Sequence, residues 1–185
     1  KVVPGFTAKV VDDQGNEVPR GTVGKLALQG PVGCRYLDDP RQTDYVKNGW
    51  NYPGDSFVQD DDGYFFYQAR ADDMIITAGY NVGGPEVEDA LLRHPAVAEC
   101  GVIGKPDPVA GEVVKAFVTV RDGFTADEAL REELLAFARR RLGAVAPKEV
   151  DFDQHLPHTR SGKVMRRLLR ARELGLEEGD TSTLE

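Results

Sequence analysis

The chain has 185 residues, of which 41% are hydrophobic and 29% are charged, and its formal net charge is −8. This charge argues against general nucleic-acid binding, and no apolar run approaches the roughly 20 residues of a membrane helix. Cys34 and Cys100 are too few and too isolated for a disulfide framework or a zinc site. We expect a cytoplasmic protein without nucleic-acid or membrane partners; the sequence does not indicate its oligomeric state. Because Lys1 opens directly into a strand-like run, we also expect a piece of a longer protein.

Residues 1–71 have the pattern of short strands. Apolar and polar residues alternate over 6–11, and a second strand-like run covers 25–29. Runs at 56–59 and 64–68 flank an Asp-Gly turn, which predicts a β-hairpin. Frequent glycines and prolines keep these elements short. We therefore predict a small β-rich, barrel-like subdomain over residues 1–71.

Residues 72–185 give the order helix, strand, strand, helix, strand, helix. The expected elements are a helix over 85–93, strands over 97–103 and 113–121 separated by a loop at 104–108, a helix that ends near 142, a strand over 150–152 and a helix over 164–173. Thr125 and Glu128 have the spacing of a capping box for the second helix. The tail from Gly175 is polar, and we expect it to fray. The fold class is α+β, with a small three-stranded sheet flanked by helices in this second domain.

The segment 68–88 joins the two parts. It opens with Arg70, Asp72 and Asp73, continues through a short apolar run, and then contains Gly79 and other residues of high backbone freedom before a helix begins. Arg70 suits either a ribose or phosphate contact or a simple pair with a neighbouring carboxylate.

Two further side chains could carry chemistry. Lys163 follows Gly162 on an expected loop before a helix, where a flexible ammonium could reach an anion. The alternative is a solvated lysine that opens a basic helix. Asp55 follows an aromatic-flanked turn and could accept two hydrogen bonds from a vicinal diol such as a ribose, or could simply cap its own turn. A metal site at His155 and His158 is rejected, because Pro157 separates them and no third ligand is apparent.

Taken in register, these motifs resemble one family across nearly the whole chain. Trp50 to Asp55, Arg70-Ala71-Asp72-Asp73 with Gly79-Tyr80-Asn81, Pro85 to Glu88, and Leu156 to Lys163 together resemble the adenylate-forming superfamily of acyl-CoA synthetases, peptide-synthetase adenylation domains and firefly luciferase. The chain looks most like the benzoate and 2-aminobenzoate type of CoA ligase. The family's phosphate loop, adenine-binding segment and acyl pocket have no counterpart in this chain, so we expect it to be inactive alone.

The resemblance implies a role for each candidate residue. Asp55 would hold the ribose of ATP and Arg70 would contact the same nucleotide; Asp72 would be the hinge of a mobile C-terminal domain that covers 72–185, and 1–71 would be the end of the large domain. Lys163 would bridge the substrate carboxylate and the α-phosphate. Gly79 and Tyr80 would line the tunnel for the pantetheine arm of CoA, and Arg139 would lie near the CoA 3′-phosphate.

The implied reaction uses a small carboxylic acid, ATP with Mg²⁺ bound through the nucleotide, and CoA. It gives an acyl-adenylate first and a thioester second. Two alternatives remain: an adenylation domain that delivers its acyl group to a carrier protein, and a non-catalytic interaction module that keeps the fold. Five residues depart from the family pattern, namely Tyr52, Pro53, Ala69, Asn81 and His158.

Overall fold

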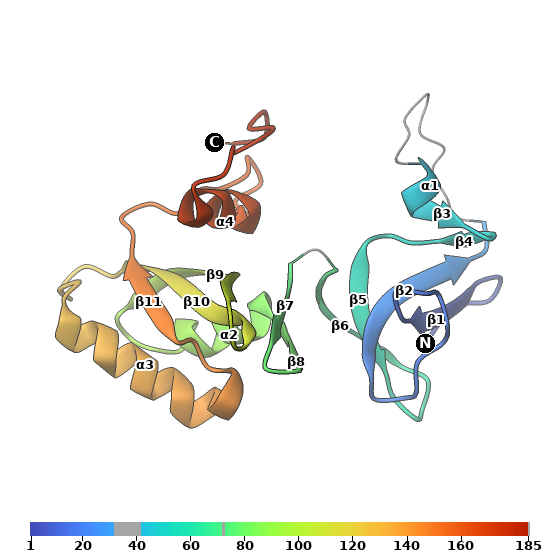
Figure 1. Ribbon diagram of the computed structural model, residues 1–185, viewed down its shortest axis with the longest axis horizontal. Coiled ribbons are helices and arrows are strands. Elements are labelled where there is room, and N and C mark those ends of the chain that lie inside the picture. The colour runs from blue at the N-terminus through green and yellow to red at the C-terminus, as the bar shows by residue number, and fades with distance from the viewer. Residues whose placement is uncertain (32–41, 72, 185) are drawn as a thin grey trace. The chain divides into compact units, whose positions relative to one another are not determined.

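The computed structural model describes residues 1–31, 42–71 and 73–184, and the chain divides into two compact units, Lys1–Asp72 and Asp73–Glu185 (Figure 1). Cys34 and the expected hinge residue Asp72 lie outside the described residues. No helix in the described ranges combines the length and the apolar character that are needed to cross a membrane.

The first unit is built on one six-stranded sheet in which all pairings are antiparallel. Its elements are β1 Thr7–Val11, β2 Val23–Gln29, α1 Gln42–Tyr45, β3 Val46–Lys47, β4 Trp50–Asn51, β5 Asp55–Gln59 and β6 Phe65–Arg70. The strand order is β3-β4-β2-β5-β6, and β1 pairs with β2. The predicted hairpin is present as β5 and β6. Its turn is longer than a two-residue Asp-Gly turn, because Asp60 accepts hydrogen bonds from the backbone of both Gly63 and Tyr64.

The second unit alternates helices with the strands of another sheet. Its elements are β7 Met74–Thr77, β8 Tyr80–Gly83, α2 Gly84–Leu92, β9 Val97–Asp107, β10 Gly111–Val120, α3 Glu128–Leu142, the 3₁₀ turn η1 Gly143–Val145, β11 Glu149–Phe152 and α4 Arg166–Leu174. The α+β class is confirmed. The sheet has five strands where three were expected, because the β7–β8 hairpin of the joining segment also belongs to it, through the pairing of Thr77 with Gly111.

Helices cover both faces of the second sheet. Successive side chains of a strand point to opposite faces, so the neighbours Val102 and Ile103 of β9 belong to different apolar clusters. Val102 packs in the large core formed with α2 and α3, whereas Ile103 packs with Leu169 of α4. Figure 1 accordingly shows α3 and α4 on opposite sides of β10. The free thiol of Cys100 is buried in the larger core.

The expected loop at 104–108 was mostly wrong, because β9 continues to Asp107. The run contains Pro106, which lacks an N–H and is tolerated only where no neighbour needs that donor. β9 pairs only with β10 among the described strands, so its other edge makes no such demand. Gly104 also has a packing reason to be glycine, since a Cβ there would lie 2.6 Å from the carboxylate of Glu112.

The capping box at Thr125 was also wrong. Asp127 is the N-cap of α3, and its carboxylate accepts a hydrogen bond of 2.9 Å from the backbone N–H of Leu130. An aspartate caps a helix as well as a threonine does. Because Asp127 stands directly before the first helical residue, its carboxylate is the one that accepts from a free N–H group of the first turn.

The tail does not fray as expected over the described residues. The backbone N–H of Arg160 donates to the carbonyl of Thr183, and Leu184 forms a β-bridge with Thr159. The guanidinium of Arg167 donates to the carbonyls of Glu178 and Asp180. Backbone and side-chain hydrogen bonds therefore anchor a tail that has few apolar residues.

Candidate functional site

Asp55 and Arg70 face each other across the β5–β6 hairpin. The two residues are register partners, and Nη1 of Arg70 lies 3.5 Å from Oδ1 of Asp55. The same Nη1 donates to the carbonyl of Pro53 at 3.1 Å. Strand pairing therefore brings together the two residues expected on the nucleotide side. The Asp55 side chain is partly buried, and that of Arg70 is exposed.

The turn before Asp55 makes room for the guanidinium. Gly54 has φ +84°, and a Cβ at this position would lie 2.9 Å from Nη2 of Arg70. Its carbonyl accepts a hydrogen bond of 2.8 Å from the N–H of Ala71, which fixes the end of β6. Glycine is thus required at this turn both by its backbone conformation and by the close approach of Arg70.

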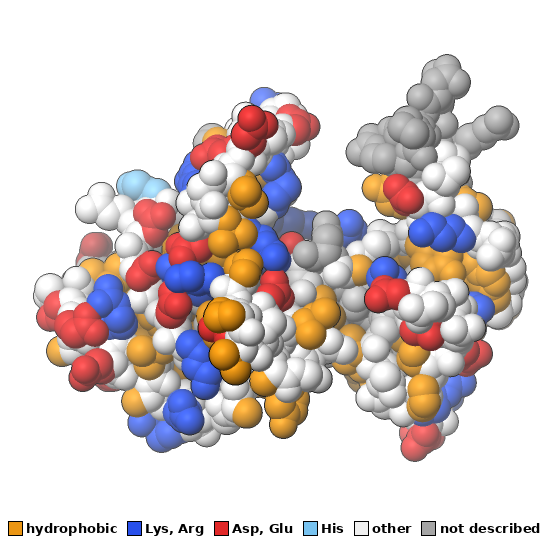
Figure 2. All heavy atoms as spheres, viewed as in Figure 1, with side chains coloured by type: hydrophobic (Ala, Val, Ile, Leu, Met, Phe, Trp, Pro, Cys, Tyr) orange, Lys and Arg blue, Asp and Glu red, His pale blue; other side chains and the backbone are white. Residues whose placement is uncertain are grey.

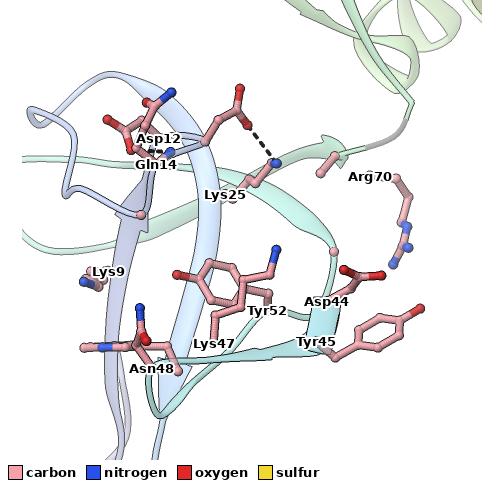
Figure 3. Close-up of a pocket in the computed structure, with 15 residues that line it drawn as sticks. Lys9, Asp12, Gln14, Lys25, Asp44, Tyr45, Lys47, Asn48, Tyr52 and Arg70 are labelled. Atoms are coloured by element: carbon pink, nitrogen blue, oxygen red, sulfur yellow. Dashed lines mark hydrogen bonds and ion pairs between the residues drawn. The ribbon is translucent and has the colours of Figure 1, made fainter. Parts of the chain in front are cut away.

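Arg70 also lines a polar hollow of about 620 Å³ within the first unit (Figure 3). Both cationic and anionic side chains line it: Lys25 pairs with Asp13 at 2.8 Å, and Lys9 lies over the ring of Trp50 at 4.4 Å. The lysines of this hollow stand on separate strands and follow no motif, so no sequence pattern predicted them. Such a mixed lining suits a polar ligand better than an apolar one.

The β7–β8 hairpin presents Gly79 and Tyr80 at its tip. Ala78 and Gly79 have φ +48° and +84°, which are the positive values of a two-residue type I′ turn between the partners Thr77 and Tyr80. The Tyr80 side chain is exposed. The tight turn therefore holds an aromatic ring at the surface.

Lys163 ends a short loop whose backbone is fixed by three hydrogen bonds. The N–H of Thr159 donates to the carbonyl of Lys163 at 2.9 Å, the N–H of Gly162 donates to the carbonyl of Thr159 at 2.8 Å, and the N–H of Lys163 donates to Oγ1 of Thr159 at 3.1 Å. The Lys163 side chain is exposed, and its ammonium forms no hydrogen bond or ion pair within the described ranges. A rigid loop thus presents a cation that remains available to an anion.

Three sets of charged contacts attach α4 to the rest of the second unit. Arg166 pairs with Glu88 of α2, Arg170 pairs with Glu112 of β10 at 2.9 Å, and Glu173 accepts from both Lys115 and Lys105. On the face in view in Figure 2, acidic and basic side chains are likewise interspersed. No sequence pattern predicted these contacts, because the partners are far apart along the chain. The one local signal was a pair of arginines at the expected start of a helix.

Lys115 is the most buried charge of these contacts. Its Nζ lies 2.7 Å from Asp151 and 2.7 Å from Glu173. Burial works against the charged form, but the hydrogen bonds to the two carboxylates outweigh it, so the pKa of Lys115 is raised. Burial likewise opposes ionisation of Glu173, and its bonds to Lys115 and Lys105 prevail and lower its pKa.

The remaining candidate, Arg139, is exposed in the last turn of α3, where a positive charge favours the helix dipole. This helix packs against α2, η1 and β11. No hydrogen bond or ion pair found in the described part of the chain links Arg139 to Gly79 or Tyr80. The candidate residues are divided between the two units. The first unit contains Asp55 and Arg70, and the second contains Gly79, Tyr80, Arg139 and Lys163.

Comparison with known proteins identifies the family. The AMP-binding enzyme C-terminal domain matches residues 86–163. The acetyl-coenzyme A synthetase of Bacillus subtilis is 47% identical over all of this chain, and that of Methanothrix soehngenii is 42% identical over 98% of it. The chain covers 33% and 29% of these two proteins, so it spans about a third of its curated relatives.

Solved structures agree with the sequence relatives. The anthranilate CoA ligase AuaEII, in complex with anthranoyl-AMP, superimposes with a TM-score of 0.81 and 34% identity, over 93% of this chain and 34% of that one. The chain belongs to the adenylate-forming, AMP-binding superfamily and corresponds to the C-terminal part of its acyl-CoA synthetases.

Proposed function

We propose that the longer protein containing this chain is a cytoplasmic, AMP-forming acyl-CoA ligase, and that 1–71 completes its large domain while 72–185 is the mobile domain. The observation that carries the proposal is the rigid loop that presents the unpaired ammonium of Lys163. This loop lies in a chain that aligns over its full length with an acetyl-coenzyme A synthetase.

In the first half-reaction, an oxygen of the substrate carboxylate attacks the α-phosphorus of ATP. The bond from that phosphorus to the bridging oxygen breaks, and pyrophosphate leaves with the bond electrons. Asp55 accepts hydrogen bonds from the ribose, Arg70 contacts the nucleotide, and Lys163 stabilises negative charge between carboxylate and phosphate. Mg²⁺ enters bound to the phosphates of ATP.

In the second half-reaction, the CoA thiolate attacks the acyl carbon of the adenylate, the bond to AMP breaks, and AMP leaves. A rotation about Asp72 removes Lys163 and brings in the hairpin tip with Gly79 and Tyr80, which borders the pantetheine arm. Arg139 contacts the CoA phosphate. One mobile domain then serves both steps.

The acid is a separate part of the proposal. The resemblance points to benzoate or 2-aminobenzoate, as does the name of the anthranilate ligase, whereas the first curated relatives are named for acetyl-CoA. We propose a small acid, with acetate tested beside the aromatic ones.

The test is ATP–pyrophosphate exchange by the full-length protein with acetate, benzoate, 2-aminobenzoate and medium-chain acids, followed by detection of the product. Acid-dependent exchange and an acyl-CoA product are expected. A product formed only on a carrier-protein thiol would replace the CoA assignment, and no exchange with any acid would favour a non-catalytic module. We expect the 185-residue chain alone to be inactive, and robust exchange by it would contradict that.

A further inference from the structure

The first turn of α4 carries positive charges, although the N-terminal end of a helix favours negative ones. Arg166 and Arg167 are its first two residues, no acidic residue lies in the first turn, and the N-cap Met165 has no side-chain cap. The positive end of the helix dipole disfavours cations there. A contact outside the helix must therefore offset this cost.

Arg166 finds that contact in the buried carboxylate of Glu88. Nε donates to Oε1 at 2.8 Å and Nη2 donates to Oε2, so the pair is a two-bond fork. Oε1 also accepts a hydrogen bond of 2.9 Å from the backbone N–H of Val102. One buried carboxylate thus joins the start of α4 to α2 and to β9.

The surroundings of this pair are shaped to admit it. A Cβ on Gly84 would lie 3.2 Å from Nε of Arg166, and a Cβ on Gly101 would lie 2.6 Å from Leu169 and 2.9 Å from Val164. Two glycines on α2 and β9 therefore let the start of α4 approach closely.

Arg166 stands between two functional positions. Its Nη1 lies 3.8 Å from Oδ2 of Asp73, the residue after the proposed hinge. In the other direction it is three residues after Lys163. The intervening chain is fixed, because Val164 forms a β-bridge with His158 and the N–H of Met165 donates to the carbonyl of Pro157 at 2.8 Å.

We propose that Arg166 is a positioning residue: through Glu88 and Asp73 it fixes the Lys163 loop relative to the start of the mobile domain. This inference rests on the proposed function for its catalytic consequence, but its structural part does not. The lysine would then reach the α-phosphate from a defined place when the domain closes, and a loose loop would slow the first half-reaction more than the second.

Arg170 supplies a matched control. It lies one turn further along α4 and pairs with Glu112, a carboxylate that also accepts a hydrogen bond of 3.0 Å from the N–H of Ile76. This pair anchors the same helix to the sheet. In the described part of the chain, no hydrogen bond or ion pair joins Arg170 to the Lys163 loop or to Asp73. If the Arg166 contacts act only by anchoring α4, substitution of Arg166 and substitution of Arg170 should therefore have equal effects.

The structural arm measures amide hydrogen exchange at Gly162 and Lys163 in the chain itself. Arg166→Gln and Glu88→Gln should speed this exchange by about tenfold at temperatures where thermal unfolding shows both variants folded, and Arg170→Gln by less than about threefold. Arg166→Lys should fall between. If Arg166→Gln does not fold, Glu88→Gln and Arg166→Lys decide. Equal exchange in the Arg166 and Arg170 variants would overturn the proposal.

The catalytic arm uses the full-length protein. Arg166→Gln should lower the kcat of ATP–pyrophosphate exchange by about tenfold with little change in the KM for ATP, and should change thioester formation from supplied acyl-adenylate by less than about threefold. A parallel loss of both half-reactions would indicate a merely structural role and overturn the inference. If the unmutated protein shows no exchange, the proposed function fails, and hydrogen exchange alone decides the inference.

Discussion

The two units place their candidate residues by different means. In the first unit, Asp55 and Arg70 meet because they are partners in one hairpin, about 15 residues apart in sequence. In the second unit, the Lys163 loop depends on a helix that is attached by charged contacts with residues up to 78 positions away. A site made by strand register tolerates the loss of a side chain, whereas a site made by long-range ion pairs depends on each partner.

Removal of the Lys115 side chain should give the largest loss in the free energy of unfolding of the second unit. Lys115→Ala leaves the carboxylates of Asp151 and Glu173 without their shared cation. Glu173 keeps its contact with Lys105 and the Asp151 side chain is half-exposed, so we expect a cost of about 1.5–3 kcal/mol, as for a hydrogen bond to a charged group. Urea unfolding of the chain measures this. Asp55→Asn in the first unit is the control and should change the free energy of unfolding by less than about 1 kcal/mol, because that pair is partly exposed. Similar losses from both would refute the contrast.

Lys163→Ala should affect activity and not stability. Loss of one preorganised charge at a site of developing negative charge costs about 2.7–4 kcal/mol, so acid-dependent pyrophosphate exchange in the full-length protein should fall by roughly 10²–10³. Thioester formation from supplied acyl-adenylate should stay within about threefold. An equal fall in both steps would exclude the assigned role. Arg160→Ala, which removes another exposed cation of the same loop, is the control.

Acid should weaken the second unit through Glu173. Its pKa is lower in the folded chain than its ordinary value of 4.5, so its contribution to stability is present above pH 4.5 and is lost as the pH falls through the folded pKa. We expect Glu173→Gln to be less stable than the unmutated chain at neutral pH and to lose less stability on acidification below pH 4.5. Parallel pH profiles of the two proteins would contradict this.

Relief of the strained turn should give the smallest effect. Ala78 has φ +48°, a left-handed conformation that costs an alanine about 1 kcal/mol and suits asparagine better. Ala78→Asn should therefore raise the free energy of unfolding by about 0.5–1 kcal/mol. Ala126→Asn, at an exposed loop position of the second unit that does not have a positive φ, serves as a control. A destabilised Ala78→Asn chain would mean that the methyl group packs against a neighbour.

Sequence patterns predicted the elements whose signals are local. The β5–β6 hairpin, the helices α2 and α3 and the strand β11 follow from periodicity and turn residues, and the hairpin needed only small extensions at its ends to include Asp55 and Arg70. The loop motif around Lys163 was equally local.

The rest depended on contacts between distant segments. No local rule shows that β9 lies at an edge where Pro106 is tolerated, or that Thr77 pairs with Gly111. Glu88 belonged to a recognised motif, but its partner Arg166 lies 78 residues further along the chain. The hydrophilic tail was expected to fray because composition does not reveal the backbone partners that residues 159–160 offer it.

Alkylation of the buried thiol of Cys100 can report when the second unit opens. Burial and the neighbouring charge of Glu88 raise the pKa of the thiol despite the opposing effect of Arg166, so it stays protonated and shielded while the core beneath α2 and α3 is closed. An alkylating reagent can then modify Cys100 only during openings of the unit, since the thiolate is the reactive form. Peptide mapping separates its labelling from that of Cys34. The rate of labelling would report openings of the core between the sheet and α2 and α3, on the face opposite α4, without any added probe.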